Sequence, residues 1–236
     1  MAAPLTEMAI DKIRGLIISG VLPPGARLPP EQELANQLGS SRNTTREAVR
    51  ALVTARVLDV RRGDGTYVTS LRPELLLEGI GFAVELMQDE SALELIEVRK
   101  ALEPAVTELA AERIEAAELE QLRRHLALMR AAETDVEELV VHDQDFHETV
   151  AAAARNPTMS SMLRGISGGT LRARVWRGIL EEDAARRTVA EHEAIYAALA
   201  AGDTALARAA ALVHVATTEG FLRRVLGTPR RTRHEA

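Results

Sequence analysis

The chain has 236 residues, which at roughly 100–200 residues per domain allows one large domain or two small ones. Hydrophobic residues make up 46% of the chain and aromatic residues only 3%, so aliphatic side chains must build the core. The absence of cysteine excludes disulfides, thiolate metal sites and cysteine nucleophiles, and it fits the reducing cytoplasm, where we expect the protein to act. No apolar run approaches the roughly 18 residues of a membrane span, so no membrane partner is expected.

Charge is divided unevenly along the chain, whose formal net charge is −6. Residues 1–70 hold 9 Lys and Arg against 7 Asp and Glu, whereas the remaining residues hold 20 against 28. The acidic total therefore conceals a mildly basic N-terminal third. Because nucleic-acid binding depends on the local field, the total charge does not exclude a DNA partner.

The N-terminal segment predicts three helices. Apolar residues at helical spacing indicate a first helix that ends at Gly20. A pair of prolines precedes a second helix over residues 31–38. Ser40 and Ser41 are candidate N-caps of a third helix, which runs to about Thr54. Two short helices joined by a glycine-containing turn are typical of a helix-turn-helix.

Two strand-like segments follow the third helix. Residues 58–62 and 66–68 alternate between apolar and polar side chains, and Gly63-Asp64-Gly65 between them can form the turn. We therefore expect a β-hairpin wing, which makes the N-terminal domain a winged helix-turn-helix.

The third helix carries a row of arginines. Arg42, Arg46 and Arg50 are spaced four residues apart and share one helix face. Such a row can reach guanine edges or phosphates, although a solvated basic face is the ordinary alternative. The predicted DNA-binding residues are Arg42, Asn43, Thr44, Thr45, Arg46 and Arg50 on this helix and Arg61, Arg62, Gly63 and Gly65 on the wing.

The segment LPPGARLPPEQELANQLGSSRNTTREAVRALVTARVLDVRRGDGTYV resembles the winged-helix domain of GntR-type bacterial transcription regulators. The resemblance implies that Arg42 and Arg46 contact operator DNA. It also reveals one departure, because this chain has Gln32 where the family commonly has arginine. That difference is expected to alter one base or phosphate contact.

The rest of the chain reads as all helix. Ser91 can cap a long helix. Pro104 lies inside this helix and is expected to kink or divide it. Further helices are predicted over residues 115–132, 135–154, 157–177, 184–201 and 203–226. The expected fold is mainly α, a winged helix-turn-helix followed by an antiparallel helical bundle. The predicted domains are a DNA-binding domain over residues 1–70, a helical connector over 71–90, an effector-binding and dimerisation domain over 91–228 and a flexible tail over 229–236.

Four residues of the predicted bundle have side chains that suit a metal. Asp143 and His147 lie one helical turn apart, and His192 and His214 lie on later helices. One carboxylate and three imidazoles suit Zn, Ni, Mn or Fe. The alternatives are core histidines satisfied by hydrogen bonds and a surface Asp–His pair. Other candidate side chains are expected to lie off this face or in solvent, namely His125, His142 and Asp145.

Residues 91–226 resemble the FCD effector domain of the FadR-type branch of the same regulators. The matching pieces are EVRKALEP, the Asp143–His147 pair, RNP, the segment from EHEAIYAAL to GD, and the distant His214. The resemblance implies a divalent metal, commonly zinc, that helps to hold a small carboxylate effector. It makes Arg99 a candidate partner of that carboxylate, with a salt bridge at the surface or inside the bundle as the alternative. Arg172 and Arg174 are further effector-binding candidates.

Together these features predict a DNA-binding transcriptional regulator, a repressor that acts as a homodimer on a palindromic double-stranded operator and responds to a carboxylate metabolite. We do not expect an enzyme. Two alternatives remain open at this point: a regulator that senses the metal directly, and a metal-dependent enzyme built on the Asp/His cluster.

Overall fold

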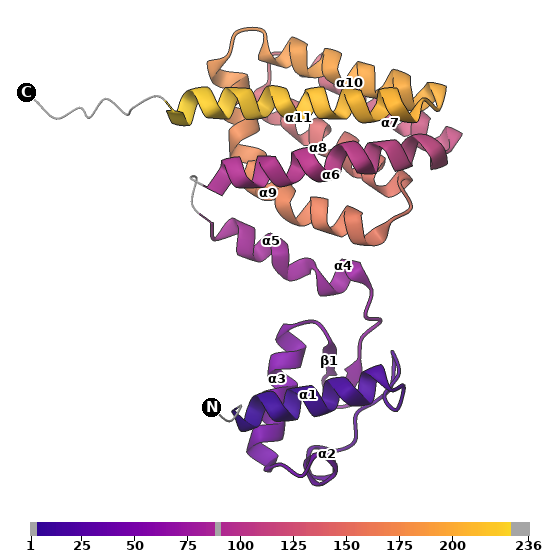
Figure 1. Ribbon diagram of the computed structural model, residues 1–236, viewed down its shortest axis with the longest axis vertical. Coiled ribbons are helices and arrows are strands. Elements are labelled where there is room, and N and C mark those ends of the chain that lie inside the picture. The colour runs from indigo at the N-terminus through magenta and orange to yellow at the C-terminus, as the bar shows by residue number, and fades with distance from the viewer. Residues whose placement is uncertain (1–3, 88–90, 228–236) are drawn as a thin grey trace, which may run out of the picture. The chain divides into compact units, whose positions relative to one another are not determined.

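The computed structural model describes residues 4–87 and 91–227 (Figure 1). The chain divides into two compact units, with the boundary between residues 79 and 80. The N-terminal unit contains α1 (Leu5–Ile18), α2 (Glu31–Leu38), α3 (Arg42–Thr54), β1 (Leu58–Arg61) and β2 (Gly65–Val68). This order of elements confirms the predicted winged helix-turn-helix.

The turn between α2 and α3 follows from its local sequence. Gly39 ends α2 in the left-handed conformation, with a φ of 60°, which costs glycine little. Ser41 then caps α3, because its Oγ accepts a hydrogen bond from the backbone N–H of Thr44 at 3.0 Å. These two residues set the direction in which α3 leaves the turn.

The wing is an antiparallel hairpin. Its register pairs Leu58 with Val68 and Arg61 with Gly65. Leu58 and Val68 are buried, and they join apolar residues of the three helices in one core. Burial at this end of the hairpin ties the wing to the helices and leaves its tip exposed.

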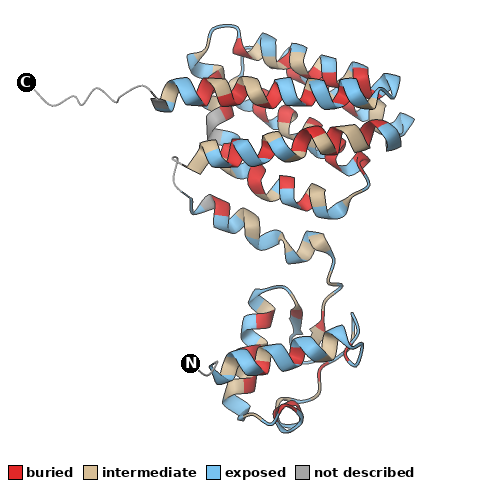
Figure 2. Cartoon of the chain, in the orientation of Figure 1, coloured by how far each residue is buried: buried red, intermediate tan, exposed pale blue. Residues whose placement is uncertain are grey.

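The second unit is a bundle of antiparallel helices. The connector holds α4 (Pro73–Leu76) and α5 (Glu78–Glu85), and the bundle holds α6 (Ala92–Arg113), α7 (Ala116–Ala131), α8 (Val136–Ala153), α9 (Pro157–Leu180), α10 (Ala184–Ala201) and α11 (Thr204–Gly227). Figure 1 shows α6 and α11 side by side and antiparallel. Buried residues lie on the facing sides of the helices (Figure 2). None of the described helices has the length and apolar character needed to cross a membrane.

One sequence expectation for this unit needs correction. Pro104 does not divide its helix, because α6 runs unbroken from Ala92 to Arg113. Proline removes only one backbone donor, and packing of α6 against α8, α9 and α11 outweighs that loss. The segment predicted as a helical connector contains two short helices with Leu77 between them. The predicted tail at 229–236 lies outside the described residues.

Replacing Ser41 with alanine is expected to lower the free energy of unfolding of the N-terminal unit by about 1 kcal/mol, because α3 loses its N-cap. Urea denaturation followed by far-UV circular dichroism measures the change. Ser70→Ala, an exposed serine outside the helices, serves as the control. Equal loss in the two variants would contradict the capping role.

Candidate nucleic-acid interface and metal centre

The arginine row of α3 is solvent-accessible. The side chains of Arg42, Arg46 and Arg50 are 61%, 38% and 69% exposed. Arg50 pairs with Glu47 at 3.0 Å on its own helix. Exposed guanidinium groups aligned on the second helix of a helix-turn-helix match the chemistry of a surface that binds DNA.

A carboxylate from α2 engages two of these arginines. The guanidinium of Arg46 donates to both oxygens of Glu31 at 3.1–3.3 Å, and Arg42 Nε donates at 3.4 Å. The hydrogen bond from Arg46 is the largest of the effects that lower the pKa of Glu31. The sequence alone does not indicate this contact, because Glu31 and Arg46 lie fifteen residues apart on different helices.

Thr45 does not belong to the exposed surface. Its side chain is fully buried, and its Oγ1 is hydrogen-bonded to Ser40 Oγ at 2.8 Å. The prediction that the Thr45 side chain contacts DNA is therefore wrong, because this side chain packs inside the turn between α2 and α3. Thr44 Oγ1 lies 2.7 Å from Ser41 Oγ at the cap, and Asn43 is exposed.

The wing presents its basic residues at the tip. Arg61 stacks over the ring of Tyr67 at 4.1 Å, and Arg62 is exposed. Gly65 has a φ of 145°, and a Cβ there would lie 2.7 Å from Arg27 Nε. Gly63, with a φ of 75°, makes the turn. The glycines therefore shape the wing, and the arginines carry its charge.

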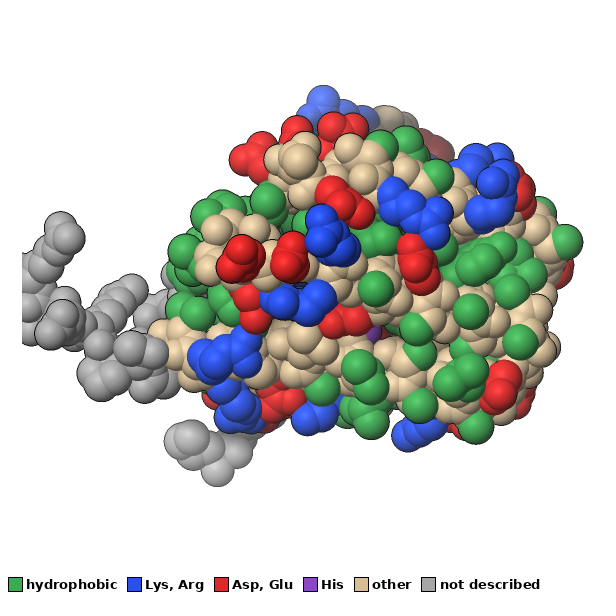
Figure 3. Space-filling model, turned by 90° about the horizontal axis from the view of Figure 1, so that it is seen from above, with side chains coloured by type: hydrophobic (Ala, Val, Ile, Leu, Met, Phe, Trp, Pro, Cys, Tyr) green, Lys and Arg blue, Asp and Glu red, His purple; other side chains and the backbone are tan. Residues whose placement is uncertain are grey.

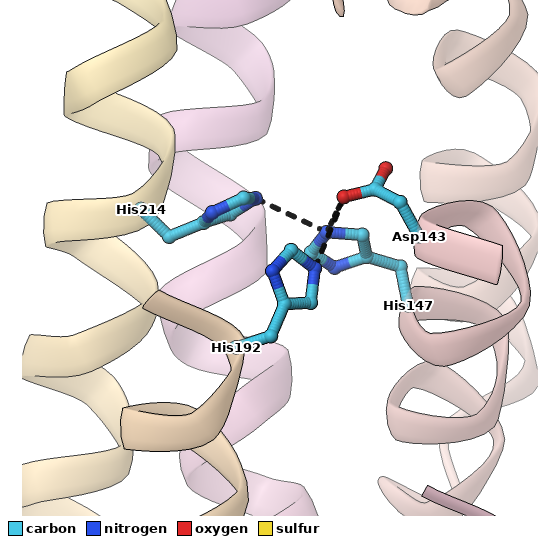
Figure 4. Close-up of side chains that lie close together, drawn as sticks. All are labelled: Asp143, His147, His192 and His214. Carbon is cyan, nitrogen blue, oxygen red and sulfur yellow. Dashed lines mark hydrogen bonds and ion pairs between the residues drawn. The ribbon is translucent and has the colours of Figure 1, made fainter. Parts of the chain in front are cut away.

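The four predicted metal ligands come together in the bundle. Asp143 and His147 extend from α8, His192 from α10 and His214 from α11 (Figure 4). One ligand atom from each lies within 4.8 Å of all the others. Asp143, His192 and His214 are buried. The tertiary structure thus brings polar side chains from α8, α10 and α11 together inside an apolar core.

Hydrogen bonds outside the cluster orient two of the histidines. His192 Nδ1 donates to the carbonyl of Thr188 at 2.8 Å, and His214 Nδ1 donates to Glu191 Oε2 at 2.9 Å. A carbonyl and a carboxylate only accept, so in each neutral ring Nε2 carries the lone pair. Such outer partners are the usual means of orienting histidine ligands. Sequence reasoning did not identify Glu191.

The cluster fits a divalent metal. Asp143 Oδ1 lies 3.0 Å from His192 Nε2 and 3.7 Å from His147 Nε2, and His147 Nε2 lies 3.1 Å from His214 Nε2. Metal–ligand bonds of about 2.0–2.1 Å place neighbouring ligands roughly 3.0–3.4 Å apart. His192 Nε2 is buried with no hydrogen-bond partner in the described structure, although it faces a carboxylate oxygen. A cation between these two atoms would satisfy both.

Burial sets the charge states within the cluster. Loss of solvation lowers the pKa of His147 well below its ordinary range, and it lowers that of His214 as well. Burial by itself would raise the pKa of Asp143, but Arg174 and His192 outweigh it and hold this pKa well below the usual value. An ionised carboxylate and neutral imidazoles are the forms that bind metals.

The arginine candidates occupy different environments. Arg174 forms a buried ion pair with Asp143 Oδ2 and donates to Gln144 Oε1 at 2.9 Å. Arg99 is instead held within the bundle, where it donates to Glu103 at 2.7 Å and to Thr170 at 2.9 Å. The salt-bridge alternative for Arg99 thus describes its contacts. The side chain of Arg172 lies outside the described residues.

Two cavities flank the cluster. One is lined by His147, Gln144 and Glu103, whose pKa falls to about 2 because Arg99 outweighs the effect of burial. The other has Asp143 and His214 in its wall, together with Arg174 and Arg177. Arg177, which the sequence did not single out, donates to Glu181 at 3.1 Å. The second cavity therefore has two residues of the Asp/His cluster and two guanidinium groups in its wall.

Each of the two units matches a known protein-family model. Residues 5–68 match the family model of bacterial regulatory proteins of the gntR family, and residues 94–217 match the FCD domain. The chain is similar to the HTH-type transcriptional regulator LutR of Bacillus subtilis, with 34% identity over 88% of this chain and 96% of the relative.

Two further relatives agree. The galactonate operon transcriptional repressor of Escherichia coli is 30% identical over 93% of this chain and 97% of its own length. A solved structure, Streptococcus agalactiae GntR, has a TM-score of 0.61 and 29% identity, with 91% of this chain and 99% of that one covered. These likenesses are to DNA-binding regulators, so the metalloenzyme alternative is set aside. The chain belongs to the gntR family of bacterial transcriptional regulators and carries an FCD domain.

Proposed function

We propose that this regulator represses transcription and that a small carboxylate, bound at a divalent metal in the bundle, controls its affinity for DNA. The observation that carries the proposal is the buried Asp143–His147–His192–His214 cluster in the wall of an arginine-lined cavity. Residues 1–70 would bind DNA, 71–90 would connect, and 91–228 would bind the effector and dimerise.

The exposed face of α3 supports the assignment of the DNA contacts. Arg46 and Arg42 hold their guanidinium groups beside Glu31, which limits their freedom before binding. DNA phosphates or guanine edges would replace the carboxylate as partner. Gln32 is exposed and bonded to Asn36, so this position brings an amide rather than a charge to the surface.

The donor set supports zinc, with nickel, manganese or iron as the other metals it suits. A bound metal of this kind would supply a Lewis-acidic centre for the oxygen atoms of an effector. Arg174 holds Asp143 through Oδ2 and leaves Oδ1 directed at the histidines. Glu191 orients the imidazole of His214 by a hydrogen bond, and the Thr188 carbonyl orients that of His192.

The effector class follows from the cavity and from the relatives. Two relatives are named for a galactonate operon and, as a putative regulator, for an L-lactate dehydrogenase operon, and both acids are 2-hydroxycarboxylates. Arg174 Nε is buried without a hydrogen-bond partner among the described residues. In this proposal Arg174 pairs with an organic carboxylate through this nitrogen, while other oxygen atoms of the effector reach the metal. We propose a small 2-hydroxy acid or sugar acid.

A homodimer on a palindromic operator fits this function, because two symmetry-related α3 helices would read two half-sites. Large apolar side chains remain exposed on the bundle, among them Ile179, Leu180 and Val213 at 60–65%. Figure 3 shows apolar side chains gathered between charged ones on one face. The effector would act by binding better to one arrangement of the dimer than to another.

Arg46→Ala is expected to weaken DNA binding by about 1–3 kcal/mol if the guanidinium reads a base. The measurement is fluorescence anisotropy on a duplex that the wild-type protein selects from a random pool. Arg14→Ala removes an arginine that is 65% exposed on α1 and serves as the matched control. An Arg46→Ala affinity equal to that of the control would refute the contact.

Glu191→Gln is expected to reduce metal affinity roughly 10–100-fold, because His214 loses a charged partner while the ring remains bonded to an amide oxygen. Competition with a chromophoric chelator measures this affinity. Glu193→Gln, on the same helix but paired with Arg130, should leave the affinity unchanged.

The effector proposal predicts that L-lactate or galactonate raises the stability of the metal-loaded protein only. A ligand at about 100 times its dissociation constant adds about 2.7 kcal/mol to the free energy of unfolding. Thermal unfolding with excess zinc, and after treatment with a chelator, provides the comparison, with galactitol as the ligand lacking a carboxylate. Equal shifts in both states would argue for an arginine-based pocket, and stabilisation by metal alone would favour a direct metal sensor.

A further inference from the structure

A second histidine–carboxylate cluster lies on a different face of α8. We infer that His125, His142 and Asp145 bind a second divalent transition metal, of which Zn²⁺ is the representative. This site shares no ligand with the first cluster and does not depend on the proposed effector function.

The three side chains converge from two packed helices. His125 extends from α7, while His142 and Asp145 lie three residues apart and therefore on one face of α8. One ligand atom from each residue lies within 4.8 Å of the others. The sequence did not indicate this meeting, because it depends on how α7 packs against α8.

The imidazoles of this cluster lack the hydrogen bonds that buried rings normally make. Both ring nitrogens of His125 are buried without a partner among the described residues, and so is Nδ1 of His142. His142 Nε2 has one neighbouring carboxylate oxygen, that of Glu138 at 3.7 Å. Leaving buried polar atoms unpaired is costly. A neutral imidazole has one lone pair and one N–H, so a metal would take the lone pair of each ring and satisfy one nitrogen of each.

The surroundings allow a cation to enter and to be neutralised. A surface cavity has both His125 and Asp145 in its wall. Further charged side chains that line this cavity are Glu118, Glu148 and Arg164. Asp145 is exposed, so an ion can reach the cluster from solvent. Two imidazoles and a carboxylate form a mixed N/O set that suits zinc or nickel, and water or a nearby carboxylate can complete it.

The consequence is that α8 serves two metal centres from two faces. Asp143 and His147 face the core, whereas His142 and Asp145 face α7. A metal at the second site would clamp α7 to α8 beside the first centre.

The test counts metal in the full-length protein. Chelator-stripped wild-type and variant proteins are equilibrated with ZnCl₂ and separated from free metal by gel filtration, and zinc per chain is measured by mass spectrometry. His125→Ala is expected to hold one zinc fewer than the wild type, and to keep that difference when His192→Ala disables the first centre. His234→Ala controls for binding by the tail histidine and should match the wild type.

Circular dichroism establishes that each variant is folded. If His125→Ala does not fold, Asp145→Asn decides, since it changes an exposed side chain and should also lose one equivalent. A folded His125→Ala protein with the zinc content of the wild type, in either background, would overturn the proposal. Because the difference is read with and without the first centre, failure of that centre leaves this test intact.

Discussion

The pairing of the buried Asp143 carboxylate with its neighbours is the interaction on which the packing of the bundle depends. A charge in an apolar core is tolerated only with close partners, and here Arg174 of α9 and His192 of α10 provide them. His147 and His214 extend the same polar cluster to α11. Three of the four ligand positions are buried, so the helices must keep this packing to keep the charges paired. The core that holds the bundle together thus also gathers four side chains that could hold a metal ion.

A related principle operates in the DNA-binding unit at the surface. Glu31 accepts hydrogen bonds from Arg42 and Arg46, so these two guanidinium groups already have an anionic partner within the unit. In solvent such pairs contribute little to stability, and they can exchange for phosphates without a large penalty. In the bundle the arginine–carboxylate pairs are buried away from water, and they have a structural role. Burial therefore separates arginines available to DNA from arginines that organise a cavity.

Arg99 illustrates why residue roles were harder to predict than residue positions. Its segment indicated a carboxylate partner, and a carboxylate is present, but it is Glu103 on the same helix. Arg177 was overlooked, although it lines the cavity that holds Arg174. Thr45 shares its helix with the arginine row, yet it faces Ser40 and the core. The Arg99–Glu103 pair has the four-residue spacing of one helix face, so the sequence offered this partner as well. Arg177 instead contacts Glu191 and Thr218 on other helices, which spacing along one helix does not reveal.

Local signals in the sequence were sufficient for the winged helix, for the bundle helices and for the Asp143–His147 pair on one face of α8. Caps, glycine turns and apolar periodicity act over a few residues, so they can be read without knowing the fold. Only the tertiary structure decided that His192 and His214 meet that pair, and that His125 meets His142 and Asp145. These meetings depend on how helices far apart in the chain pack against one another, and that packing is determined by the burial of the whole core rather than by any local pattern.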